Sequence, residues 1–183
     1  MSQVSEHPND TIGGGGGSGV LRILGVDPGL SITGYGVVDI KIGNIEPTLV
    51  EGGVFKFKSK QSVEARLAQL YNDMKELIIE VRPDQLAIEK LYSHYAHPRT
   101  AIIMGHARGV ILLAAQQAGM TLHHLGANEV KKSITGYGHA SKEQIQRAVQ
   151  SQCNLKDLPE PPDLADAIAI ALTHARRIAV DKL

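Results

Sequence analysis

The sequence has one cysteine, no tryptophan and as many Asp and Glu residues (19) as Lys and Arg residues (19). A single cysteine, Cys153, excludes both an intramolecular disulfide and a cysteine-rich zinc site, and this usage is typical of a reducing compartment such as the cytoplasm. No apolar run approaches the roughly 20 residues that cross a bilayer, and residues 1–20 lack the basic and apolar segments of a secretory signal. We therefore expect a cytoplasmic protein with no membrane partner.

The balanced charge argues at first against a nucleic-acid partner, because domains that bind phosphate backbones usually carry an excess of Lys and Arg. A chain of 183 residues suits one domain with a sizeable core. Residues 13–19 are almost all glycine and cannot bury surface. The sequence thus predicts a flexible tail at residues 1–20 and a folded domain at residues 21–183.

The pattern of apolar residues predicts the fold. Three extended segments separated by turn residues, at 21–27, 33–40 and 48–58, predict a β-meander. Helices and short buried strands then alternate, at 63–81, 85–89, 100–117, 121–125, 128–135, from Ser141 onward and at 163–179. This order predicts an α/β protein with a mixed five-stranded sheet flanked by helices, which is the ribonuclease H-like fold.

Four acidic residues occupy positions where a carboxylate is locally unfavourable. Asp27 ends one apolar strand and Glu89 ends another, while Asp163 and Asp166 open an apolar helix and share one of its faces. If the two strands are neighbours and the last helix crosses their ends, the four carboxylates converge. Their mutual repulsion would be relieved by a hard divalent cation with oxygen ligands.

Each acid also has an ordinary structural explanation. Asp27 precedes Pro-Gly and could form a turn, and Asp163 or Asp166 could be an acid favoured at a helix N-terminus. Glu89, at the end of a strand, has no such role. The coincidence of all four therefore favours a metal site, and Mg²⁺ held by carboxylates suits phosphoryl chemistry, in which two ions clamp the attacking and leaving oxygens.

Other catalytic arrangements are weaker. Cys153 lies in a polar helix tail and reads as an incidental thiol. The pairs His94/His97 and His123/His124 lack further ligands at zinc-like spacing, so we interpret them as surface or packed histidines.

Several short segments carry a further signal: ILGVDPG (23–29), TGYG (33–36), AIE (87–89), GHARG (105–109), VKK (130–132), GYG (136–138), DLADA (163–167) and TH (173–174). In order and spacing they resemble the RuvC family of Holliday junction resolvases, over residues 21–176. TGYG after a strand-end Asp also resembles the phosphate hairpins of sugar kinases and actin-like ATPases, but those folds need two related domains.

The resemblance implies a metal-dependent endonuclease that acts as a homodimer and nicks two opposed strands of a four-way DNA junction, in recombination and repair. It implies that Asp27 bridges two Mg²⁺ ions, with Mn²⁺ as an alternative metal. Glu89 would complete one ion site, and Asp163 with Asp166 the other, although some relatives have His in place of the first acid of this pair. RuvA and RuvB would be branch-migration partners.

The resemblance also marks residues that would contact DNA. Tyr92, three residues after Glu89, matches an aromatic that stacks on bases at the junction. Lys131 and Lys142 match basic positions near the cleaved phosphate, although either could be an ordinary surface lysine. Gly105 and Gly109 lie four residues apart in one predicted helix, where they would let a second subunit approach or would serve packing within the chain.

Two alternatives remain at this point: a junction-binding module that has lost cleavage, and an RNA-processing nuclease of the related RuvX/YqgF type. Retention of all four acids argues against the first. The charge balance no longer argues against DNA, because setting aside two tail acids and the four candidate ligands leaves 13 acidic against 19 basic residues.

Overall fold

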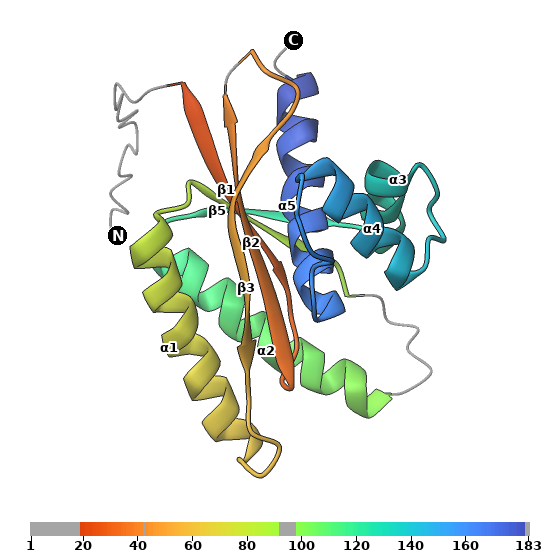
Figure 1. Ribbon diagram of the computed structural model, residues 1–183. Helices are drawn as coiled ribbons and strands as arrows, with labels where there is room; N and C mark the ends of the chain where they lie inside the picture. Colours follow the sequence, from red (N-terminus) through yellow and green to blue (C-terminus); the bar gives the residue numbers. More distant parts are fainter. Residues whose placement is uncertain (1–18, 42, 92–97, 182–183) are drawn as a thin grey trace, which may run out of the picture.

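A mixed five-stranded sheet organises the computed structural model, which describes residues 19–41, 43–91 and 98–181 (Figure 1). The strands lie in the order β3-β2-β1-β4-β5. Antiparallel pairing joins β1 (Val20–Asp27), β2 (Ile32–Lys41) and β3 (Thr48–Lys56), and β4 (Gln85–Glu89) and β5 (Thr121–Leu125) add in parallel beyond β1. The predicted α/β class and mixed five-stranded sheet are confirmed.

Helices cover both faces of this sheet. On one face lie α1 (Val63–Val81) and α2 (Pro98–Gln117), and on the other lies α5 (Pro162–Asp181), flanked by α3 (Ala127–Thr135) and α4 (Lys142–Gln152) (Figure 1). Successive strand residues point to opposite faces, so Ile23 enters the core under α5 and Leu24 the core under α1 and α2. Two apolar cores therefore fix the central strand β1.

Local signals set the helix ends. Ser62 caps α1 by accepting a hydrogen bond from the backbone N–H of Ala65, and the helix ends at Val81 before Pro83. Ser141 and Gln144 form the capping box expected at the start of α4, with both hydrogen bonds present. Since α4 begins at residue 142, this cap also fixes where the Lys142 side chain starts.

Helix α5 lies directly on the backbone of β1 and β2 because glycines face it. A Cβ atom added to Gly34 would lie 2.0 Å from the carbonyl oxygen of Asp163, and one added to Gly25 would lie 2.5 Å from that of Ala167. Atoms cannot approach so closely, so only glycine allows α5 to sit at this height over the sheet. The same helix carries Asp163 and Asp166, and the glycines therefore set the depth of both carboxylates.

Two predictions on chain organisation have different outcomes. Among the described helices none is long and apolar enough to span a membrane. The predicted tail at residues 1–20 stays a prediction, because residues 1–18 lie outside the part of the chain that the structure describes.

Candidate active site

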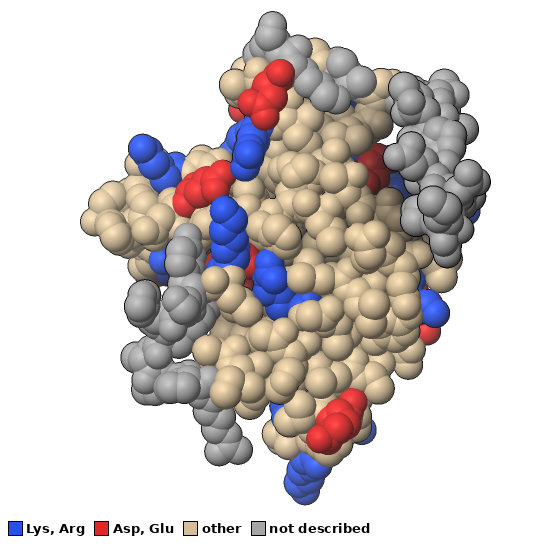
Figure 2. Space-filling model, turned by 180° about the vertical axis from the view of Figure 1, so that it is seen from behind, with Lys and Arg blue, Asp and Glu red and all other residues tan. Residues whose placement is uncertain are grey.

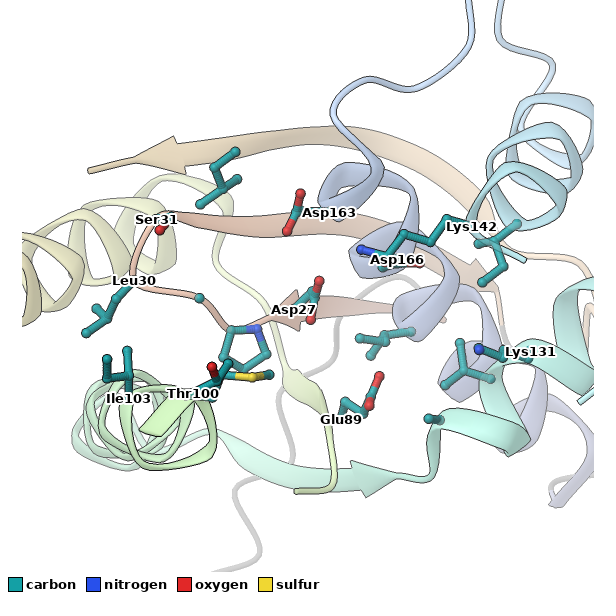
Figure 3. Close-up of a pocket in the computed structure, with 18 of the residues that line it drawn as sticks. Asp27, Leu30, Ser31, Glu89, Thr100, Ile103, Lys131, Lys142, Asp163 and Asp166 are labelled. Atoms are coloured by element: carbon teal, nitrogen blue, oxygen red, sulfur yellow. Dashed lines mark ion pairs between the residues drawn. The ribbon is translucent and has the colours of Figure 1, made fainter. Parts of the chain in front are cut away.

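The four predicted acids line one cleft, whose volume is about 630 Å³. Strands β1 and β4 run in parallel with Val26 opposite Ile88, so Asp27 and Glu89, one residue further along, reach the same edge of the sheet. The first turn of α5 crosses this edge and brings Asp163 and Asp166 to it (Figure 3). The convergence predicted from sequence is thus present in the fold.

Asp27 is buried more deeply than Glu89 and Asp166. Its pKa is raised to about 8, first by burial and then by the nearby carboxylates of Asp166, Glu89 and Asp163, against a smaller lowering by Lys142. A carboxyl group with this pKa is mostly protonated at neutral pH. The cleft therefore holds more acidic groups than its own cations can keep ionised.

The pKa values of Glu89 and Asp166 are also raised, although less than that of Asp27. Burial is the main cause that raises the pKa of each, and Lys131 and Lys142 oppose it in both cases. The Nζ atom of Lys142 lies 4.0 Å from a carboxylate oxygen of Asp166. Lys131, in the middle of α3, and Lys142, at the start of α4, are thus the cations that lower the pKa of these acids.

The donor chemistry of the cleft fits a hard divalent cation, since all four candidate ligands are carboxylates and additional positive charge would relieve their repulsion. Among the described residues no three acidic, histidine or cysteine side chains already form a tight ligand cluster. The cleft therefore presents the acids as separate ligands around an open space.

Hydrogen bonds from β2 and α1 fix the turn that follows Asp27. The buried hydroxyl of Thr33 accepts from the backbone N–H of Gly29 (3.2 Å) and donates to its carbonyl (2.6 Å). Arg66 in α1 donates from Nη1 to the carbonyl of Leu30 at 2.8 Å. These contacts tie the turn to β2 and α1, and the position of Asp27 is held with it.

Sequence analysis missed Thr33 and Arg66. A signal for Arg66 existed: it lies three residues after Val63 and four before Leu70, on the inward side of the helical pattern, where a cation is unexpected. The buried Thr33 gave no comparable signal, because threonine is common in strands.

Lys131 and Lys142, predicted to contact DNA, both line the cleft (Figure 3). Tyr92 lies outside the described residues, as do His94 and His97, so its proposed contact with bases stays a prediction.

The remaining histidines pack away from the cleft. The His123 ring packs at a tilt of 34° against the His174 ring, with centroids 4.0 Å apart, and Nδ1 of His124 lies 2.7 Å from Nη2 of Arg108. Neither lines the cleft, which agrees with their interpretation as surface or packed residues.

The Cys153 thiol is half-buried and burial raises its pKa, which disfavours the reactive thiolate. Cys153 is not among the residues that line the cleft.

Comparison with known proteins gives one consistent result. The family model described as "Crossover junction endodeoxyribonuclease RuvC" matches residues 23–174. The curated RuvC of Rhodopirellula baltica is 47% identical over 82% of this chain and 83% of its own length, and that of Brevibacillus brevis is 42% identical over 85% and 92%. A solved structure of Thermus thermophilus RuvC with a Holliday junction substrate matches with a TM-score of 0.79 at 33% identity, covering 88% of this chain and 97% of that one.

The family model covers the edge of the sheet where β1 and β4 end and the start of α5, so all four acids of the cleft fall within the matched region. The mixed sheet with flanking helices also agrees with the Thermus structures, and the fold is the ribonuclease H-like one. By its sequence, its fold and the extent of both matches, the chain belongs to the RuvC family of crossover junction endodeoxyribonucleases.

Proposed function

We propose that this protein is a structure-selective endonuclease that resolves four-way DNA junctions by paired, symmetric nicks in recombination and repair, acting in the cytoplasm. The observation that carries the proposal is the raised pKa of Asp27 within a cleft lined by three further carboxylates. Divalent cations would relieve the repulsion between these carboxylates, and phosphodiester hydrolysis is a reaction that divalent cations promote. The relative from Thermus thermophilus, solved with a Holliday junction substrate, supports the choice of DNA.

Membership of the RuvC family implies dependence on a divalent metal. We propose two Mg²⁺ ions per site, with Mn²⁺ as an alternative. When bound, they would lower the pKa of a water molecule and withdraw charge from the scissile phosphate. Asp27 would contact both ions, Glu89 would complete one set of ligands, and Asp163 with Asp166 would complete the other.

The chain's own cations would serve the same reaction. Lys142 occupies the first turn of α4, where the helix dipole disfavours a cation, yet its side chain is 69% exposed and faces Asp166 across the cleft. Lys131 approaches Glu89 and Asp166 from α3. Both ammonium groups would contact the phosphate next to the acids and offset the negative charge that builds up in the transition state.

Tyr92 would stack on bases at the junction, which is worth about 1–3 kcal/mol per base. We expect Tyr92→Ala to cleave more slowly while its demand for Mg²⁺ stays the same. Wild-type turnover by this variant would instead assign Tyr92 to packing of its own loop.

A homodimer would place two such clefts on one junction, and the surface of α2 supports it. Ile102, Gly109 and Leu113 lie on one face of this helix, and the two apolar side chains are 60% and 51% exposed. A Cβ at Gly109 would meet nothing within 4 Å, so packing inside the chain does not require glycine there. The side of the molecule opposite to Figure 1 has a broad surface with few charges (Figure 2).

The dimer has a direct test. Ile102→Glu should convert a dimer into monomers in analytical ultracentrifugation, because a carboxylate would be buried against a second apolar helix. A wild-type chain that sediments as a monomer at micromolar concentration would contradict the proposed dimer. Partnership with RuvA and RuvB is proposed from family membership alone.

The activity is tested with labelled four-way junction, linear duplex and RNA–DNA hybrid, each with and without Mg²⁺. We expect cutting of the junction only with the metal, and loss of cutting but not of junction binding in Asp27→Asn and Glu89→Gln. Undiminished cutting by either variant would refute the assignment of the metal site. Preference for the RNA–DNA hybrid would favour the RNA-processing alternative.

A further inference from the structure

A third cation lines the cleft on the side away from the two lysines. Arg66 reaches the cleft from α1 and holds the carbonyl oxygen of Leu30. Figure 3 shows Leu30 at one end of the cleft and Lys131 at the other, with Asp27 and Glu89 between them. A polyanion that crosses the acids would therefore meet positive charge on both sides.

In the part of the chain that the structure describes, no acidic side chain pairs with Arg66. Its only hydrogen-bond acceptor among these residues is the uncharged carbonyl of Leu30. Its Nε atom is buried and has no acceptor at all. The cations that lower the pKa of the cleft carboxylates are Lys131 and Lys142, and Arg66 is not among them.

Placing a guanidinium in a partly buried position without an anion costs stability. A helix position that packs against the turn at Leu30 could be filled by an apolar residue without that cost. The bond from Nη1 to Leu30 also holds the planar group in one orientation, which lowers the entropy lost when a second acceptor binds. These features suit a residue whose partner is an external anion.

We propose that Arg66 binds a backbone phosphate of the DNA strand at the Leu30 end of the cleft. Cations would then contact the strand on both sides of the scissile phosphate. This proposal rests on the proposed function, since it needs DNA to cross the acids. Arg66 would then set which phosphate lies over Asp27, in addition to holding the turn in place.

The salt dependence of binding separates the two roles of Arg66. Each phosphate contact that is lost reduces the slope of log K against log[NaCl] by about 0.9, whereas a defect in the turn lowers affinity without changing the slope. We would measure binding of a synthetic four-way junction to the Asp27→Asn chain, which should not cut it, between 50 and 200 mM NaCl. The variants Arg66→Gln and Arg66→Lys are then added to this background.

We expect Arg66→Gln to reduce the slope by about 0.9 per cleft. Its loss of affinity relative to the Asp27→Asn background should therefore be about threefold to fourfold smaller, per contact, at 200 mM than at 50 mM NaCl. Arg66→Lys should keep the slope, because it keeps the charge. The matched control is Arg82→Gln, which removes an exposed arginine at the other end of the same helix and should leave the slope unchanged.

A second measurement uses the unaltered protein and does not depend on whether the variant folds. Bound junction should protect Arg66, and not Arg82, from modification by phenylglyoxal, as read by mass spectrometry. An unchanged slope in Arg66→Gln, or equal modification of Arg66 with and without junction, would overturn the phosphate contact while leaving the proposed function intact. Failure of the Asp27→Asn chain itself to bind the junction would refute the proposed function and this proposal together.

Discussion

Substituting Asp27 by Asn should stabilise the metal-free protein at neutral pH while it abolishes cleavage. The pKa of Asp27 is about 8 in the folded protein, mainly through burial, against 3.8 without the fold. The folded state therefore binds this proton more tightly than the unfolded state does, and the free energy of unfolding falls as pH rises from about 4 to 8. Asn has the shape of the protonated acid and carries no proton to lose.

The size of the effect follows from these values. A pH of 7 lies about three units above the pKa of this carboxyl group in the unfolded chain and just below its pKa in the folded protein. Keeping Asp27 in the folded protein therefore lowers the free energy of unfolding at pH 7 by on the order of 4 kcal/mol, at 1.36 kcal/mol per unit. At pH 4.5 the same calculation gives about 1 kcal/mol. For a chain of this length each kcal/mol shifts Tm by about 2–4 °C, so Asp27→Asn should melt up to about 8–16 °C higher at pH 7.

Thermal unfolding in EDTA, followed by circular dichroism at pH 7 and pH 4.5, measures the gap in Tm between Asp27→Asn and the parent chain. Asp157→Asn, which removes an exposed carboxylate, is the matched control and should leave Tm unchanged. Saturating Mg²⁺ should narrow or reverse the gap, because only the parent chain keeps all its ligands. An Asp27→Asn variant that melts below the parent in EDTA at pH 7, or a gap that is the same at both pH values, would refute the reasoning.

Three further outcomes follow from the cleft. The Mg²⁺ concentration for half-maximal cleavage should fall up to about tenfold per pH unit from pH 6 to 8, because metal binding displaces the Asp27 proton; a flat dependence contradicts this. Gly34→Ala should lose most of its activity and stability in cleavage and melting assays, since its Cβ would lie 2.0 Å from the carbonyl oxygen of Asp163. The control Gly138→Ala, whose Cβ would make an ordinary contact at 3.5 Å, should behave as wild type in both assays. Lys142→Met should cleave about 100–1,000-fold more slowly. Its pH profile should shift upward, because a cation that lowers the pKa of the acids is gone, and an unshifted profile would contradict this role of Lys142.

Much of the fold and the four acids could be predicted because their signals are local. A periodicity of apolar residues and a capping serine define α1 and α4, so Val63–Val81 and the start of α4 at Ser141 were predicted correctly. Asp27 and Glu89 were informative because each ends an apolar strand, and parallel neighbours end at the same edge of a sheet.

The parts that escaped prediction depend on contacts between residues far apart in the chain. Arg66 reads as one more helical arginine until α1 is placed beside Leu30, and nothing in the order of residues gives that packing. The same holds for Gly34 in the TGYG segment, because nothing in the order of residues identifies its close partner, the backbone of Asp163 in α5. Patterns identify which residues are unusual, and the packing of helices on the sheet decides what they touch.

The neutral sequence conceals a separation of charge that explains how this cleft can accept DNA. Most ion pairs among the described residues, such as Arg22–Asp39 and Arg176–Glu46, join residues that do not line the cleft. Among the described residues, the cleft is lined by four carboxylates and three cations, so it is close to neutral and would repel a phosphate only weakly. Two divalent cations would add four positive charges and make it a strong anion site. Holding the scissile phosphate over the acids should thus depend on the metal, whereas binding of the junction as a whole, which Asp27→Asn is expected to keep, depends on the cations around the acids.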